Sequence, residues 1–219
     1  MLKEPKLPPL STANYRTLLH QADIPWTADA QDRLDRFVDL LQEWNAFAGL
    51  VAPGDLAHLE AAHIADSLSL APVIKSLAGD RARVLDIGSG GGFPAIPLKL
   101  ALPGLAVTLV ERNGKKVGFL RQALGTLHLE DVTILHGDFP AILRHYPVSP
   151  QVITARAVER PPRLIRALAE FLPVEATFLC QFGDPQPHLR AELFHVEQFE
   201  DDWSRAGLRR GTLHLLRHP

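Results

Sequence analysis

Cysteine is almost missing from this chain of 219 residues, in which Cys180 is the only one. A single cysteine excludes a disulfide framework and a cysteine-rich zinc site, so we expect a reducing, cytoplasmic environment. Long apolar runs are missing too: no stretch of about 18 apolar residues suggests a membrane helix, and the first ten residues hold too many prolines for a signal peptide. We therefore expect a protein without a membrane partner and without a bound metal ion.

A strong excess of either charge is also missing, because the formal net charge is -2. The charges are nevertheless unevenly distributed along the chain. Residues 1–80 hold six Lys and Arg against eleven Asp and Glu, residues 81–170 hold twelve against seven, and residues 171–219 hold five against seven. The positive middle segment is compatible with a local surface for a polyanion on a protein that is not basic overall.

Helical patterns fill the first part of the chain. One short helix is predicted over residues 11–24, and Thr27 is placed to cap a longer helix in which apolar side chains recur at helical spacing. After the break at VAPGD, a third helical stretch is predicted over residues 55–77, with Pro72 as a kink or a restart. Residues 1–80 are therefore expected to form an N-terminal helical cap.

The pattern changes at residue 81 to alternating strands and helices, which implies a parallel sheet covered on both faces. Strands are predicted near residues 83–88, 106–111, 131–136, 151–157, 176–182, 193–200 and 211–218. The last two alternate like an antiparallel pair, with no clear helix between them. We expect residues 81–219 to form an α/β domain with a mostly parallel sheet that makes one compact unit with the cap.

The sequence DIGSGGGF joins the first predicted strand to the next helix. In an open α/β sheet the ligand lies beyond the carboxyl ends of the strands at such a turn, and glycines leave no side chain between the backbone and the ligand. A dinucleotide site requires a third glycine where this chain has Phe93, which argues against a nicotinamide cofactor. The remaining pattern, Asp86-x-Gly88-x-Gly90-x-Gly92, resembles the S-adenosylmethionine loop of the Rossmann-like methyltransferases.

The cationic amine and the sulfonium of this cofactor suit an acid such as Asp86 at the end of the first strand. Acids at the ends of the next two strands fit the same cofactor. Glu111 ends the second predicted strand, where an acid is expected to accept hydrogen bonds from both ribose hydroxyls. After the third strand, Asp138 can accept a hydrogen bond from an adenine amino group, and Phe139 can pack on the ring. Taken singly, each of these features is also explained by a tight turn or a solvated strand end.

Several longer stretches make the resemblance more specific. VLDIGSGGGFPAIPL, LVERNGKKVGFLRQ and ITARAV, with the upstream LQEWNAFAGL and AHIADSLSLAP, resemble the 16S ribosomal RNA guanine-N7 methyltransferase family, also called glucose-inhibited division protein B. The resemblance implies a Rossmann-like methyltransferase fold and transfer of a methyl group from S-adenosylmethionine to N7 of a guanine in small-subunit ribosomal RNA. It also implies ribosomal RNA or the small ribosomal subunit as the partner, and we expect a monomer.

The motif positions and the resemblance together assign the site residues. The expected cofactor-binding residues are Asp86, Gly88, Ser89, Gly90, Gly92, Phe93, Glu111, Asp138, Phe139 and Arg156. Arg156 takes the place of the family's arginine after the fourth strand, where its fork can orient the cofactor or guanine O6; a structural ion pair is the alternative. Guanine N7 carries a lone pair at neutral pH, so we nominate no catalytic base and expect catalysis by positioning.

Four residues are candidates for contact with RNA. Lys115 and Lys116 begin the helix after the second strand and can meet phosphates, although a solvated helix face explains them equally well. His63 and Asp66 are three residues apart and so share one helix face, from which they can pair or reach over the site. A structural histidine is the alternative for His63.

The chain departs from the family pattern at several positions on the expected substrate side. Gly49 and Val51 replace an Asn and a Thr, residues 181–183 replace the usual Lys-Gly pair, and Asp138 stands in or next to the place of an arginine. Two alternatives therefore stay open. One is a methyltransferase that acts on a small molecule or another RNA, and the other is a non-catalytic module that binds the cofactor or the ribosome.

Overall fold

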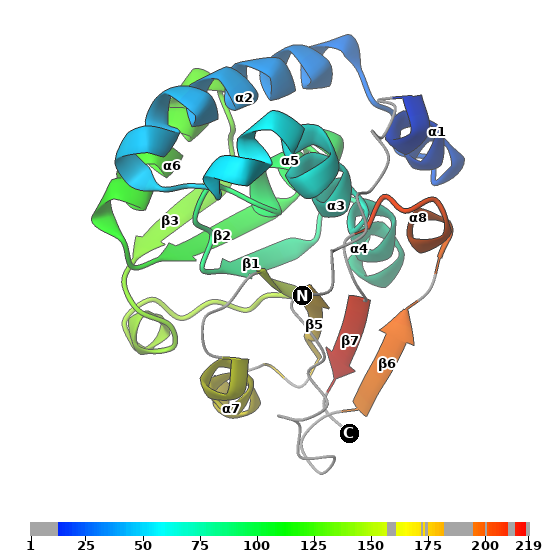
Figure 1. Ribbon diagram of the computed structural model, residues 1–219. Coiled ribbons are helices and arrows are strands. Elements are labelled where there is room, and N and C mark those ends of the chain that lie inside the picture. Colours follow the sequence, from blue (N-terminus) through cyan, green and yellow to red (C-terminus); the bar gives the residue numbers. More distant parts are fainter. Residues whose placement is uncertain are drawn as a thin grey trace, which may run out of the picture.

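A seven-stranded sheet in the order β3-β2-β1-β4-β5-β7-β6 forms the centre of the computed structural model (Figure 1). The structure describes residues 13–156, 161–171, 173, 175–181, 195–199, 201–209 and 213–217. The strands are β1 (Arg83–Ile87), β2 (Ala106–Glu111), β3 (Val132–His136), β4 (Val152–Arg156), β5 (Thr177–Gln181), β6 (His195–Phe199) and β7 (Leu213–Arg217). Strands β1 to β5 pair in parallel, whereas β7 is antiparallel to both β5 and β6. The predicted mostly parallel α/β sheet with a C-terminal antiparallel pair is confirmed.

The connection between the two antiparallel strands differs from the prediction in one detail. A four-residue helix, α8 (Asp202–Arg205), lies between β6 and β7. Asp201 caps its N-terminus: the Asp201 side chain accepts a hydrogen bond from the backbone N–H of Ser204 at 3.1 Å. Such a cap stabilises a single helical turn, which is too short to give a periodic apolar pattern in the sequence.

The remaining helices are α1 (Ala13–Gln21), α2 (Ala28–Ala48), α3 (Ala65–Leu68), α4 (Ala71–Ala78), α5 (Ala95–Ala101), α6 (Gly114–Thr126) and α7 (Pro161–Phe171), with 3-10 helices η1 (Pro53–His58) and η3 (Ala141–Arg144) and a π-helix η2 (Glu60–Ile64). As predicted, Thr27 caps α2: its hydroxyl accepts a hydrogen bond from Ala30 N at 3.1 Å. The helix ends at Gly49, which adopts a left-handed φ of 60°.

Two of the helix predictions differ from the structure. The single stretch predicted over residues 55–77 is divided among η1, η2, α3 and α4, with Pro72 in the first turn of α4, where its ring and missing N–H are tolerated. Helix α1 covers most of the helix predicted over residues 11–24, of which residues 11 and 12 lie outside the described part.

Alternate residues of a strand face opposite sides of the sheet. Both sides carry apolar residues here, and helices cover both. On one face, Val84 and Val107 share a core with residues of α1 to α6. On the other face, Leu85 and Val110 pack with α7 and with half-buried residues of η3. The segment after α2 is thus packed against the sheet through the same core as the helices of the first 80 residues. The division into a cap, residues 1–80, and an α/β domain, residues 81–219, stays a prediction.

Candidate active site

The glycine loop directly follows β1. Strands β2 and β4 are the parallel neighbours of β1, so the carboxyl ends of all three strands lie at the same end of the sheet. Gly88, Gly90 and Gly92 have φ angles of 73°, 52° and 83°, a region that side-chain-bearing residues rarely adopt. At Gly92 the space is also closed, since a Cβ there would lie 2.5 Å from Cδ1 of Ile96. The loop therefore exposes backbone rather than side chains at the strand ends.

Asp86 is buried just before this loop, at 1% exposure. Its Oδ1 accepts a hydrogen bond from Thr154 Oγ1 at 2.7 Å, because Thr154 is its register partner on β4. Oδ2 is buried and has no hydrogen-bond partner within the described ranges. Burial raises the pKa of Asp86 to about 6, although Thr154, Ser89 and the nearby Arg156 act in the opposite direction. An unsatisfied buried acceptor is costly, about 1–3 kcal/mol, and marks a place for a ligand's donor.

Glu111 ends β2 and ties the glycine loop to the start of α6. Its Oε2 accepts a hydrogen bond from Gly90 N at 2.9 Å, and its Oε1 accepts one from Asn113 N at 2.7 Å. Each carboxylate oxygen has a second lone pair, so both can also accept from a hydroxyl group. The neighbouring strand end is close, since Gly137 N donates to the main-chain oxygen of Glu111 at 3.0 Å.

Arg156, the last residue of β4, is held by side chains from the helical segment before β1. Its Nη1 lies 3.2 Å from Asp66 Oδ2, its Nη2 lies 2.6 Å from His63 Nδ1, and its guanidinium carbon lies 5.1 Å from the centroid of the Phe93 ring. His63 Nε2 lies 2.9 Å from Asp55 Oδ2. A guanidinium only donates, so Nδ1 of His63 accepts, and the proton of the neutral ring is on Nε2, which donates to Asp55.

The structure brings most of the predicted site residues together. Those at the adjoining ends of β1, β2 and β4 are Asp86, Gly88, Ser89, Gly90, Gly92, Phe93, Glu111 and Arg156. His63 and Asp66, the candidates from the helical cap for contact with RNA, both contact Arg156. Their contact with RNA stays a prediction. Asp66 is in fact only 3% exposed.

The other predicted residues lie on the rim of this region. Asp138 is exposed after β3, and Phe139 is half-buried against the second core. Lys115 is exposed in the first turn of α6. Lys116 is half-buried, and its Nζ would lie 4.0 Å from a Cβ at Gly90.

Sequence reasoning missed three residues that shape the site. Thr154 had a usable signal, because it is a polar residue in the middle of an otherwise apolar strand. Asn45 also had one, as a polar residue on the apolar face of α2: its Oδ1 accepts hydrogen bonds from Leu50 N and Val51 N, both at 2.9 Å. Asp55 had none, since nothing in the sequence links it to His63. Of the departures from the family pattern, Phe182 and Gly183 lie outside the described residues.

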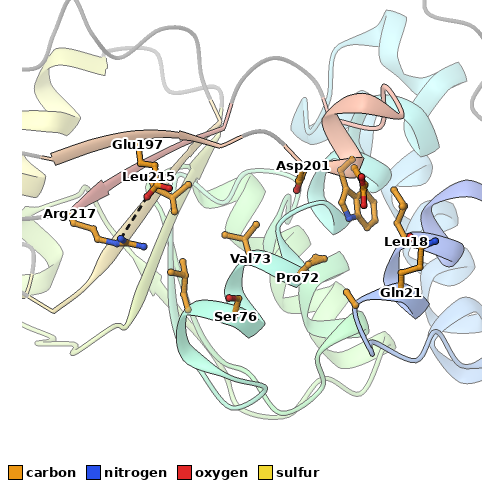
Figure 2. Close-up of a pocket in the computed structure, with 13 residues that line it drawn as sticks. Leu18, Gln21, Pro72, Val73, Ser76, Glu197, Asp201, Leu215 and Arg217 are labelled. Carbon is orange, nitrogen blue, oxygen red and sulfur yellow. Dashed lines mark ion pairs between the residues drawn. The ribbon is translucent and has the colours of Figure 1, made fainter.

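Two cavities lie away from this region. One, of about 380 Å³, lies between α1, α4, α8 and the β6–β7 pair, where Figure 2 shows Glu197 and Arg217 as an ion pair. The other, of about 650 Å³, lies at the amino-terminal end of the strands, beside the residues that precede β1, β2 and β3. Neither cavity is lined by a predicted site residue. The chemistry of the strand ends, rather than cavity size, therefore locates the site.

Two other kinds of feature are absent from the part of the chain that the structure describes. There, no three His, Cys, Asp or Glu side chains gather in a group that could hold a metal ion. The helices described include none with the length and apolar character needed to cross a membrane.

A helix-covered parallel sheet with a glycine loop after β1 and an acid at the ends of β1 and β2 defines the Rossmann-like methyltransferase class of folds. Solved structures of low sequence identity share the fold. MtNAS in complex with MTA and tNA aligns with a TM-score of 0.58 at 16% identity, covering 97% of this chain and 91% of that chain. A variant of MtNAS in complex with S-adenosylmethionine aligns with a TM-score of 0.56 at 14% identity, covering 96% and 85%.

Sequence comparison identifies the family. The GidB family model, described as rRNA small subunit methyltransferase G, matches residues 30–192. The protein of that name from Rhodopseudomonas palustris (strain BisB5) is 46% identical over 143 residues, which cover 61% of this chain and 57% of the relative. The one from Chloroflexus aggregans is 36% identical over 187 residues, covering 82% and 77%. This chain belongs to the rRNA small subunit methyltransferase G family, as its motifs indicated, and it spans little more than half the length of the first of these relatives.

Proposed function

We propose that the protein transfers a methyl group from S-adenosylmethionine to N7 of a guanine in 16S ribosomal RNA. The observation that carries the proposal is the pair of buried acids, Asp86 and Glu111, on either side of a glycine loop in a chain of this family. The family's name supplies the class of substrate, and the strand ends supply a site with matching chemistry.

The residues at the strand ends fit the cofactor. The orphaned Oδ2 of Asp86 suits a cationic amine, and the remaining lone pairs of Glu111 suit the two ribose hydroxyls. Asp138 and Phe139 stand where the adenine would lie. When bound, the cofactor supplies an electrophilic methyl group on its sulfonium.

The protein's own contribution to transfer is positioning. Guanine N7 has its lone pair available at neutral pH, so no side chain has to remove a proton, and alignment of the two reactants supplies the acceleration. Arg156 is suited to this role because Asp66 and His63 fix its guanidinium over the Phe93 ring. A fork held in this way can donate two hydrogen bonds to guanine O6 or to the cofactor.

Lys115 and Lys116 lie at the rim of the site and are proposed to meet phosphates of the RNA. Because the proposed substrate is ribosomal RNA, free or within the small subunit, we propose a cytoplasmic location with no membrane partner. That the protein acts as a monomer and without a metal ion stays a prediction.

Labelled S-adenosylmethionine distinguishes this function from the alternatives. The protein is incubated with the label and with naked 16S RNA, with small ribosomal subunits or with a metabolite extract. We expect the label to appear in the RNA. Treatment with borohydride and then aniline, which cleaves RNA at N7-methylguanine, should cut the RNA at the labelled base. Label only in small molecules would contradict the proposal, and so would cofactor binding without transfer. Asp86→Asn serves as the cofactor-site control and should transfer little label.

A further inference from the structure

Phe47 is the most exposed large apolar side chain among the described residues, at 60% exposure on the last turn of α2. Its ring is nevertheless fixed from two sides. Trp44 packs against it edge-on, with ring centroids 6.0 Å apart, and Lys115 Nζ lies 4.5 Å from its centroid. An aromatic ring that is held in place yet remains open to solvent is a suitable surface for stacking.

The turn that follows Phe47 lies against the glycine loop. Asn45 Oδ1 accepts hydrogen bonds from Leu50 N and Val51 N, and the left-handed Gly49 ends α2. Leu50 in turn lies against the loop: a Cβ at Gly91 would be 3.2 Å from its main-chain oxygen. Phe47 is therefore anchored at the rim of the proposed methyl-transfer site, and Figure 1 shows the helices that carry it and Lys115, α2 and α6, side by side.

The charge around Phe47 favours an anionic partner. The residues just before helix α6 and its first turn present Arg112 and Lys115 as exposed cations. Lys116 adds a third positive charge next to Gly90. On α2, Glu43 is the exposed acid one turn before Phe47. The balance at this rim is positive, although the whole chain carries a net charge of -2.

We propose that Phe47 and Lys115 form a docking point for one unpaired nucleotide of the RNA, whose base stacks on the Phe47 ring while its phosphate meets Lys115. This inference rests on the proposed function. Proteins recognise single-stranded RNA through aromatic side chains that stack on bases and cations that pair with phosphates. A protein partner would gain less here, because the exposed apolar area is one side chain next to a lysine.

Steady-state methylation of 16S RNA by Phe47→Ala and Phe47→Trp tests the stacking contact. For Phe47→Ala we expect KM for the RNA to rise roughly tenfold, the size of one lost base–aromatic contact, while kcat at saturating RNA and the affinity for S-adenosylmethionine stay unchanged. Phe47→Trp should keep the KM of the natural protein, because the larger ring also stacks. A change in kcat alone would contradict the proposal.

Lys115→Ala tests the phosphate contact. We expect the slope of log affinity against log salt concentration for RNA binding to become shallower by about one unit. Tyr146→Ala is the matched control: Tyr146 is also exposed, at 56%, and follows η3, whose side chains pack on the opposite face of the sheet. It should leave both KM and the slope unchanged.

The outcomes separate this inference from the function on which it rests. If the natural protein methylates no RNA, the proposed function fails. If it methylates RNA and Phe47→Ala has the natural KM, only the docking point is wrong. If Phe47→Ala binds naked RNA normally but loses activity on small subunits, Phe47 contacts a ribosomal protein, and the stacking proposal is overturned.

Discussion

Two arginines, the half-buried Arg156 and the buried Arg209, attach the same short helical segment to the rest of the molecule, but their surroundings differ. Arg209 has a fully buried side chain and makes a two-pronged contact with Asp201, at 2.9 and 2.8 Å. It also donates to Ser69 Oγ at 3.1 Å and to the Ser69 main-chain oxygen at 3.0 Å. These contacts are typical of a structural ion pair.

Arg156 has a more open environment. Its side chain is 13% exposed, and its contacts include one carboxylate oxygen of Asp66, the ring nitrogen of His63 and the face of Phe93. It lies close enough to Asp86 to act on the pKa of that acid. The comparison teaches that an ion pair does not by itself separate a structural arginine from a functional one. We propose a functional role for Arg156 because it lies at the strand ends, near the orphaned carboxylate oxygen of Asp86.

The largest expected effect is on stability, at Arg209. Arg209→Met leaves Asp201 without its buried cation, and breaking such a pair typically costs about 3–5 kcal/mol in the free energy of unfolding. Urea unfolding measures this loss, while the cofactor affinity of the folded protein should not change. Arg205→Met is the control, because Arg205 pairs with Asp202 on the surface, at 69% exposure, and its loss should cost less than about 1 kcal/mol. Equal losses in the two variants would show that Arg209 is not a structural anchor.

The next effect is on catalysis, at Arg156. Arg156→Lys keeps the charge that faces Asp66 but loses the two-pronged fork. We expect kcat for RNA methylation to fall about a hundredfold, equivalent to about 2.7 kcal/mol of transition-state stabilisation, with a much smaller change in the free energy of unfolding. Single-turnover kinetics and urea unfolding on the same preparation provide both values. A variant that is unstable but has a normal kcat would place Arg156 in the same class as Arg209.

Replacing Asp86 by Asn should raise the free energy of unfolding but weaken the binding of the cofactor. The pKa of Asp86 is raised from 3.8 to about 6, so the folded protein binds a proton more tightly than the unfolded chain, and stability falls as the pH rises from about 4 to about 6. Asp86→Asn removes this penalty and should raise the free energy of unfolding of the ligand-free protein at pH 7.5 by about 1–3 kcal/mol. The same variant should bind S-adenosylmethionine at least tenfold more weakly by calorimetry. Lower stability together with unchanged binding would remove Asp86 from the site.

The smallest expected effect is the pH dependence of cofactor binding. The ionised carboxylate of Asp86 attracts the cationic amine, so affinity should rise with pH through about 6 and level off above pH 7. At pH 5 only about one tenth of Asp86 is ionised, which predicts an affinity about tenfold lower than at pH 7. Titrations at both values measure the ratio, and Asp86→Asn should show little difference between them.

The sequence was sufficient to predict the sheet and the neighbouring positions of Asp86 and Glu111. Buried parallel strands are continuous apolar runs, so their positions could be read directly, and Asp86 and Glu111 had to come together because β1 and β2 are parallel neighbours. The contacts of Arg156 could not be foreseen. Asp66 is 90 residues away in the sequence, and the π-helix that contains His63 interrupts the helical period from which a face would be inferred.

Calorimetric titration of S-adenosylmethionine into the natural protein and into Glu111→Gln tests the central claim most directly. Gln keeps one oxygen, which can accept from only one of the two backbone N–H groups, and it loses the carboxylate that would accept from both ribose hydroxyls. The account predicts one cofactor molecule bound per chain of the natural protein and at least tenfold weaker binding by Glu111→Gln. No binding by the natural protein, or equal binding by both, would contradict it.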